Sequence, residues 1–137
     1  MPKIGRVLET AIHTVDMERS RRFYEDVLEL KPMAGDGRFT AYDACGGTVL
    51  LLFLAGASGE PAILPGGTIP GHGGAGRLHF AFAVSAQDLG AWEERLASRK
   101  IEIEGRMEWP RGGKSLYFRD PDGHLVELAT PGVWPNY

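Results

Sequence analysis

The chain has 137 residues, of which 43% are hydrophobic and 24% charged, and its formal net charge is -3 at pH 7. This size and balance are typical of one globular domain that buries its own core. Because the chain has no basic excess, we expect no nucleic acid partner. The single cysteine excludes an internal disulfide, and the longest apolar run, residues 49–55, is too short to span a bilayer. The sequence therefore predicts a cytoplasmic protein without membrane contact.

The first half of the chain has the pattern of a strand, a helix and further strands. Apolar alternation predicts a strand over residues 7–14, and Asp16 is the expected N-cap of a helix that Pro32 stops. Further strands are expected at 31–35, 38–43 and 48–54. Residues 56–76 then contain eight glycines and three prolines, a composition that predicts a linker or a binding loop.

The second half repeats this plan. A strand is expected over residues 78–84, and Ser85 with Asp88 has the spacing of a capping box for a second helix. Further strands are expected at 101–108, 115–119 and 124–129. We therefore predict an α+β fold of two tandem βαβββ modules that form a curved, open mixed sheet with the helices on its outer face. The expected organisation of this single domain is module one at 1–55, a linker at 56–76, module two at 77–130 and a C-terminal tail at 131–137.

The parity of strand residues points to a polar inner face. Successive residues of a strand face opposite sides of the sheet. In the strand at 78–84, Phe80 and Phe82 share the face expected to pack under the helices, which leaves His79 among alanines on the other face. The same parity places Tyr117 and Glu127 on the open face. We expect this face to form the wall of a pocket.

Glu127 is the most informative residue, because it interrupts an apolar run at 125–129. A half-buried carboxylate there is costly unless it is paired or bound to a cation. An ion pair with Arg119 or Arg111 is the alternative, but the expected neighbour His79 favours a metal. Carboxylates with an imidazole suit a divalent ion such as Zn, Ni, Co, Mn or Fe, and three protein ligands leave room for a substrate oxygen.

Three segments of the chain resemble the vicinal oxygen chelate superfamily. This group includes glyoxalase I, fosfomycin-resistance transferases, extradiol dioxygenases and bleomycin-resistance proteins. The matching segments are TVDM at 14–17 with FY at 23–24 and VLEL at 27–30, LHFAF at 78–82, and YFRDPDGHLVEL at 117–128. The resemblance covers nearly the whole chain.

The resemblance implies a set of metal ligands. In this family one ligand comes from the first strand of each module and one from the last strand of the second, which implies Glu9, His79 and Glu127 here. His13 is the rival to Glu9, but it lies roughly 13 Å further along the same strand, so the two cannot readily bind one ion. Glu9 is preferred because it stands seven residues before Asp16. His13 is then a pocket residue with a catalytic role.

Further site residues are expected around these ligands. Tyr117 matches a tyrosine that reaches the metal-bound ligand in relatives, with a simple pocket aromatic as the alternative. Arg111 and Lys114 lie in a loop expected at the pocket mouth, where they would bind an anionic substrate. His72, in the glycine-rich segment, is a candidate substrate-binding residue that would act as an acid or base. Ordinary surface positions are the alternative for Arg111, Lys114 and His72.

Three departures from the family narrow the expected activity. Leu51 stands where glyoxalase I and related epimerases have a fourth ligand. A ligand set with one histidine differs from the two histidines of extradiol dioxygenases. The chain ends at Tyr137, before much of the basic C-terminal segment of the fosfomycin-resistance group. These differences argue against all three specific activities.

The predicted function is that of a metal-dependent lyase, isomerase or dioxygenase of the vicinal oxygen chelate type. A small, oxygen-rich substrate, neutral or anionic, would chelate the metal, and the metal would stabilise an enolate or alkoxide. Glu9 or His13 would move the proton. The alternative is a protein that binds and sequesters an antibiotic without chemistry. The resemblance also implies a homodimer, with the site formed within one chain or across two.

Overall fold

Two four-stranded sheets with matching topology make up most of the fold. The structure, a computed structural model, describes residues 1–137 and divides into two units, Met1–Ala75 and Gly76–Tyr137. Each unit contains the predicted βαβββ order, so the α+β class and the repeat are confirmed. The grouping of both units in a single domain stays a prediction. No helix is long and apolar enough to cross a bilayer.

In unit 1 the sheet has the order β1-β4-β3-β2, with β1 parallel to β4 and the other pairs antiparallel. Asp16 caps the first helix as predicted, because its Oδ1 accepts a hydrogen bond of 3.0 Å from the backbone N–H of Arg19. The helical segment ends at Val27, before Pro32, because Glu29 takes a φ of 57° and redirects the chain. The elements are β1 (Glu9–Thr14), α1 (Met17–Arg22), the π-helical turn η1 (Phe23–Val27), β2 (Lys31–Gly35), β3 (Phe39–Asp43) and β4 (Val49–Leu54).

One face of this sheet makes the core of unit 1. Alternate residues of β1 and β4 are buried there with two tyrosines, as strand parity requires. The hydrophobic side chains with the lowest exposure are Ile12, Tyr24, Tyr42, Leu50 and Leu52, each at most 2% exposed. Glu9 and His13 have the opposite parity in β1 and therefore lie on the open face.

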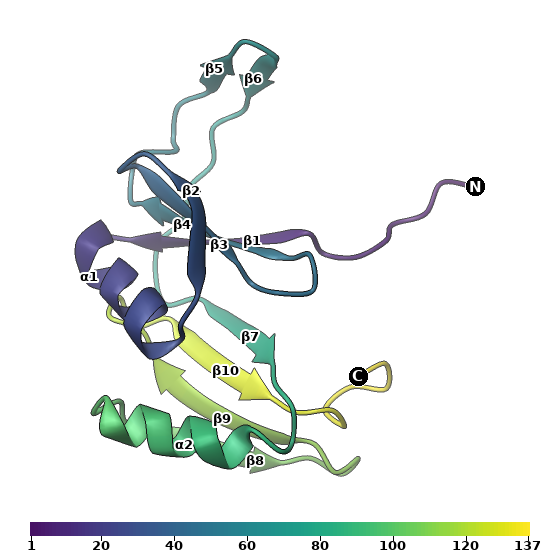
Figure 1. Cartoon of the computed structure of the whole chain (residues 1–137). Helices are drawn as coiled ribbons and strands as arrows, with labels where there is room; N and C mark the ends of the chain where they lie inside the picture. Colours follow the sequence, from purple (N-terminus) through teal and green to yellow (C-terminus); the bar gives the residue numbers. More distant parts are fainter. The chain divides into compact units, whose positions relative to one another are not determined.

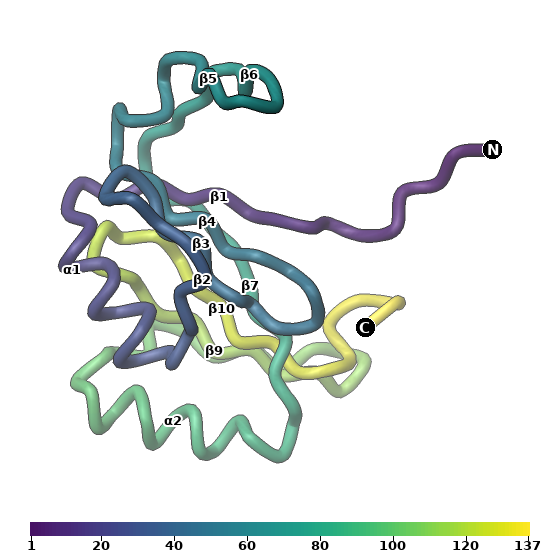
Figure 2. Tube along the Cα trace, turned by 45° about the horizontal axis from the view of Figure 1, so that its top comes forward, coloured from purple at the N-terminus to yellow at the C-terminus, as the bar shows by residue number.

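The glycine-rich segment forms a second, smaller sheet that the sequence did not predict. Strands β5 (Ala62–Leu64) and β6 (Gly67–Ile69) pair as a hairpin that projects from the β1–β4 sheet (Figures 1 and 2). At its base the N–H of His72 donates to the carbonyl of Ser58 at 2.8 Å, and the Ser58 hydroxyl donates to the carbonyl of His72 at 2.8 Å. A Cβ on Gly71 would overlap the carbonyl of Gly59, so this neck requires glycine.

In unit 2 the sheet has the order β7-β10-β9-β8, with β7 parallel to β10, and α2 lies alongside it (Figure 1). In the turn before α2 the Ser85 hydroxyl accepts from the N–H of Asp88 at 3.1 Å and donates to its carboxylate at 2.8 Å. The predicted capping box is only half formed, because the N-cap of α2 is Asp88, whose side chain makes no capping hydrogen bond. The elements are β7 (His79–Ala83), α2 (Leu89–Ser98), β8 (Gly105–Glu108), β9 (Lys114–Arg119) and β10 (Leu125–Ala129). The core contains Leu96, Leu116, Phe118, Val126 and Leu128, each at most 2% exposed.

The two units repeat the same strand register. In each, the first residue of the first strand pairs with the first residue of the parallel last strand. Glu9 therefore holds in unit 1 the position that His79 holds in unit 2. Two residues along the last strand, Leu51 in unit 1 corresponds to Glu127 in unit 2. This equivalence defines which side chains the two open faces present.

Candidate metal site in the second unit

His79 and Glu127 come together on the open face of unit 2. They lie on the adjacent parallel strands β7 and β10, and His79 Nε2 is 3.3 Å from Glu127 Oε1. Glu127 is only 7% exposed, whereas half of the His79 side chain is accessible. Strand parity thus placed both side chains on one face, although their role as ligands stays a prediction.

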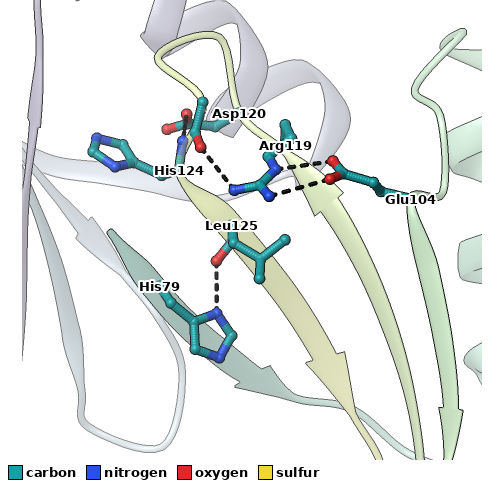
Figure 3. Close-up of polar contacts among 7 residues, drawn as sticks. His79, Glu104, Arg119, Asp120, His124 and Leu125 are labelled. Carbon is teal, nitrogen blue, oxygen red and sulfur yellow. Dashed lines mark hydrogen bonds and ion pairs between the residues drawn. The ribbon is translucent and has the colours of Figure 1, made fainter. Parts of the chain in front are cut away.

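A hydrogen bond at Nδ1 of His79 determines which of its two ring nitrogens carries the hydrogen. His79 Nδ1 is 3.0 Å from the carbonyl oxygen of Leu125 (Figure 3). A carbonyl only accepts, so Nδ1 carries the hydrogen, and Nε2 of the neutral ring turns its lone pair toward the Glu127 carboxylate. Two acceptor atoms that face each other require a cation, either a proton or a metal ion, to hold them together.

The distance between the two acceptor atoms fits a metal ion. Two ligands that each lie about 2.1 Å from one ion, at an angle of roughly 105°, are about 3.3 Å apart. The spacing of 3.3 Å between His79 Nε2 and Glu127 Oε1 matches this value, whereas it is long for a charge-assisted hydrogen bond. These two side chains therefore fit as two ligands of a divalent ion, whereas no group of three or more potential ligands comes together in the structure.

The other oxygen of Glu127 belongs to a buried hydrogen-bond chain. The Ser115 hydroxyl donates to Glu127 Oε2 at 2.6 Å, and Trp109 Nε1 donates to the Ser115 oxygen at 2.8 Å. Ser115 is 1% exposed. The hydrogen bond from Ser115 to Glu127 was not predicted from the sequence, although the parity of β9 puts Ser115 on the face of Tyr117.

Arg119 does not neutralise Glu127. Its guanidinium instead forms two hydrogen bonds with the carboxylate of Glu104, at 2.9 and 3.1 Å, and a third with the carbonyl of Gly123 at 3.1 Å (Figure 3). The ion pair between Glu127 and Arg119, which was the alternative prediction, is therefore not formed. Its nearest polar partners are Ser115 and His79.

Tyr117 lies directly opposite Glu127 in the β9–β10 pairing. Its ring centroid is 6.2 Å from that of His79. Burial raises the pKa of Tyr117, and the negative charge of Glu127 raises it further, while a hydrogen bond with Ser115 acts in the opposite direction. The phenol therefore stays protonated near neutral pH and can donate a hydrogen bond.

A cavity of about 360 Å³ adjoins these polar groups, a volume that suits a small organic molecule. Alanines and aromatic rings form most of its walls, and no lysine or arginine lines it. The C-terminal residues complete one side, because the Tyr137 hydroxyl donates to the carbonyl of Ala129 at 3.0 Å. The aromatic lining residues are Phe82, Trp109, Tyr117, Trp134 and Tyr137.

Unit 1 brings together two histidines that the sequence analysis considered separately. The ring of His72 packs edge-on against Phe53 with centroids 4.6 Å apart, and His13 lies 6.1 Å from both of these rings. Gly74 adjoins His13, since a Cβ there would be 3.5 Å from the imidazole. Glu9 is exposed at the start of the same strand. The functional roles of Glu9, His13 and His72 stay predictions.

The two cationic candidates lie at the surface. Arg111 is exposed in the β8–β9 turn, and Lys114 Nζ is 3.7 Å from Glu108 Oε1 in an exposed ion pair. Neither side chain lines the cavity of unit 2. Their substrate-binding roles stay predictions that the geometry of unit 2 does not support.

Comparison with known proteins defines the family. Residues 5–128 match the model of the Glyoxalase/Bleomycin resistance protein/Dioxygenase superfamily. The chain therefore belongs to this family, and the resemblance inferred from its motifs is confirmed. Members of the family act on small molecules, and the chain is a metal-dependent enzyme of the vicinal oxygen chelate type.

Individual relatives match over most of the chain. The metallothiol transferase FosB of Staphylococcus saprophyticus subsp. saprophyticus is 34% identical over 116 residues, which cover 84% of this chain and 70% of the relative. FosB of Shouchella clausii is 35% identical over 117 residues, covering 84% and 73%. The crystal structure of a lactoylglutathione lyase from Agrobacterium tumefaciens superposes with a TM-score of 0.87 and 31% identity, covering 98% of this chain and 99% of the lyase.

Proposed function

We propose that the chain adds a low-molecular-weight thiol to a small, oxygen-rich electrophile at a divalent metal ion. The observation that carries this proposal is the pair of facing acceptor atoms on His79 and Glu127, which line the cavity of unit 2. The thiol is suggested by the relatives, because one is named a metallothiol transferase and another is named for a glutathione conjugate.

Thiol transfer is favoured over lyase chemistry by Leu51. The family resemblance gives glyoxalase I a fourth ligand on the last strand of the first module, and the strand register assigns that position to Leu51. Leucine has no ligand atom. A site with three protein ligands remains, which leaves more positions for substrate oxygens.

The ion would be held by His79 and Glu127 of unit 2 and by Glu9. Glu9 comes from the same chain or, in a homodimer, from the second copy. An imidazole with two carboxylates suits first-row divalent ions such as zinc, manganese, nickel, cobalt or iron. When bound, the ion polarises a substrate oxygen and offsets the negative charge that develops there.

Residues of the chain would then supply binding and proton transfer. The aromatic walls of the cavity hold the carbon skeleton of the substrate. As the S–C bond forms and a C–O bond opens, the freed oxygen takes up the proton that the thiol gives up. Tyr117, which stays protonated, would donate a hydrogen bond to that oxygen, and His13 is the candidate to accept the thiol proton and release it again.

Metal binding by the purified protein tests the site. We expect about one divalent ion per chain, and at least a 100-fold weaker affinity in Glu127→Gln, since loss of a residue that merely supports a ligand already costs about 10- to 100-fold. Glu9→Gln should show a loss of similar size. Glu18→Gln is the control, because Glu18 lies on the surface of α1 and pairs with Arg22 at 2.8 Å.

The outcomes of this titration separate the competing functions. Full metal content in Glu127→Gln would contradict the ligand assignment. No retained ion in the wild-type protein, and no binding on titration with Mn, Zn, Ni or Co, would instead favour antibiotic sequestration without a metal.

The reaction itself is tested by thiol consumption. The metal-loaded protein is incubated with a thiol, either glutathione or cysteine, and with one of two substrates. These are the epoxide fosfomycin and the aldehyde methylglyoxal. Free thiol and product are then measured. Loss of thiol with a ring-opened adduct supports transfer. Formation of a lactoyl thioester from methylglyoxal would show that the chain is a lyase despite Leu51.

A further inference from the structure

The hydrogen-bond chain behind Glu127 has an assigned direction. The indole N–H of Trp109 can only donate, so the Ser115 oxygen accepts at 2.8 Å. The hydroxyl hydrogen of Ser115 is then available to Glu127 Oε2, which accepts it at 2.6 Å. Each of the three groups uses the role that its chemistry allows, so the chain is fully satisfied.

This chain determines which oxygen of Glu127 meets the histidine. With Oε2 held by Ser115, Oε1 is left facing His79 Nε2 at 3.3 Å. On the other side, the carbonyl of Leu125 holds His79 through Nδ1 at 3.0 Å. Both acceptor atoms are therefore oriented from behind by groups that do not contact the space between them.

Trp109 is itself firmly held. Its backbone N–H donates to the carbonyl of Gly113 at 2.8 Å, and its own carbonyl accepts from Gly112 at 2.9 Å, which closes the β8–β9 turn. Gly113 packs so closely on Gly132 that a Cβ would lie 2.5 Å from the Gly132 carbonyl carbon. The backbone of Trp109 is thus held in the β8–β9 turn, and its side chain lines the cavity.

We propose that Ser115 and Trp109 are positioning residues for the metal site. Ser115 orients Glu127 so that Oε1 faces the metal, and Trp109 connects the wall of the cavity to this hydrogen-bond chain. The proposal rests on the proposed function, because it requires Glu127 to be a ligand. Groups that hydrogen-bond to ligands in this way typically change metal affinity about 10- to 100-fold when they are removed.

Metal affinity is the first measurement, by calorimetric titration of the apo protein with Zn or Mn. Ser115→Ala should bind about 10- to 100-fold more weakly than the wild-type protein, and Ser115→Thr, which keeps a hydroxyl, should restore most of the affinity. Trp109→Phe removes the indole donor but keeps an aromatic ring, and it should give a smaller loss. Because Ser115 is buried, thermal unfolding of each apo variant shows whether it is folded, and Trp109→Phe provides the test if Ser115→Ala is not.

Indole fluorescence is the second measurement, and a general loss of stability would not mimic it. The chain has three tryptophans, so Trp92→Phe with Trp134→Phe leaves Trp109 as the reporter. Addition of Zn, which has a closed shell, should shift its emission, and the shift should disappear when Ser115 is also replaced by alanine. This readout does not depend on enzyme activity.

Two failures can be told apart. Normal affinity in Ser115→Ala or in Trp109→Phe, together with an unchanged Trp109 emission on metal binding, overturns the positioning role while Glu127→Gln still loses the ion. If the wild-type protein binds no ion at all, the proposed function fails first and the positioning role fails with it.

Discussion

The two units share one strand register but place different chemistry on it. In unit 2 the equivalent positions carry His79 and Glu127, whose acceptor atoms lie 3.3 Å apart. In unit 1 they carry Glu9 and Leu51, of which only the acid can bind a metal ion. The repeat thus supplies the positions, and single side chains decide whether a position becomes a ligand.

The surroundings of these positions differ as well. Glu127 is held from behind by the buried hydroxyl of Ser115. The polar side chains of unit 1 instead gather around Phe53, where His13 and His72 make aromatic contacts. We therefore expect the hydrogen bond behind Glu127 to add to metal affinity, a contribution that the aromatic contacts of His13 and His72 do not make.

Two equivalent core leucines test whether the units unfold together. Leu52 and Leu128 are at most 1% exposed, and replacement of either by alanine should cost about 2–5 kcal/mol. All three tryptophans lie in unit 2, so fluorescence reports that unit alone while circular dichroism reports both. In a single cooperative domain, Leu52→Ala shifts both urea transitions to the same extent.

An unchanged fluorescence transition in Leu52→Ala would show that the units unfold independently and would refute the single domain. Leu64→Ala is the control for both probes. Leu64 is 52% exposed on the β5–β6 hairpin, so its loss should change the stability by at most about 0.5 kcal/mol.

Leu51→Glu removes the main difference between the units. It places a carboxylate at the register position of Glu127, where by analogy with His79 and Glu127 it should meet the Glu9 side chain of the same unit, so the affinity of unit 1 for a divalent ion should rise about tenfold, which corresponds to about 1.4 kcal/mol. Val49→Glu is the matched control, because Val49 lies on the same face of β4, two residues before Leu51. Equal effects of the two substitutions on metal titration would contradict the assigned equivalence.

Surface ion pairs give the smallest expected difference. Hydrogen bonds from Arg119 lower the pKa of Glu104 in unit 2, and those from Arg38 lower the pKa of Asp36 in unit 1. A lowered pKa in the folded state stabilises the fold above the unfolded-state pKa, and this contribution is lost as the pH falls through the folded value. Stability should therefore decline on acidification through each pair.

Glu104→Gln should flatten this decline more than Asp36→Asn, because Glu104 links strand β9 to a distant segment whereas Asp36 pairs within its own turn. Thermal unfolding between pH 3 and 7 measures both. A larger effect for Asp36→Asn would show that the link across unit 2 contributes nothing.

Strand parity and motif spacing were sufficient to place much of the site. Alternation in β7, β9 and β10 put His79, Tyr117 and Glu127 on one face, because a strand with one apolar face permits no other register. The N-cap at Asp16 and the contact between Ser85 and Asp88 were also predictable, since they depend on neighbours within three residues.

Contacts that depend on tertiary packing could not be predicted in this way. The bond from Trp109 to Ser115 depends on the shape of a turn and on a side-chain rotamer, which no spacing encodes. His72 was predicted to bind the substrate or to lie at the surface of a loop, and the packing of its ring against Phe53, from a distant part of unit 1, was not predicted. The β5–β6 hairpin was hidden by a composition rich in glycine and proline.

The narrow neck beneath this hairpin makes residues 60–70 exchangeable. Paired hydrogen bonds between Ser58 and His72 close the excursion at its base, so its outer part makes no demand on the sheet below. Loops closed in this manner tolerate replacement. A different sequence can therefore replace this segment, by evolution or by engineering, while His72 keeps its contact with Phe53.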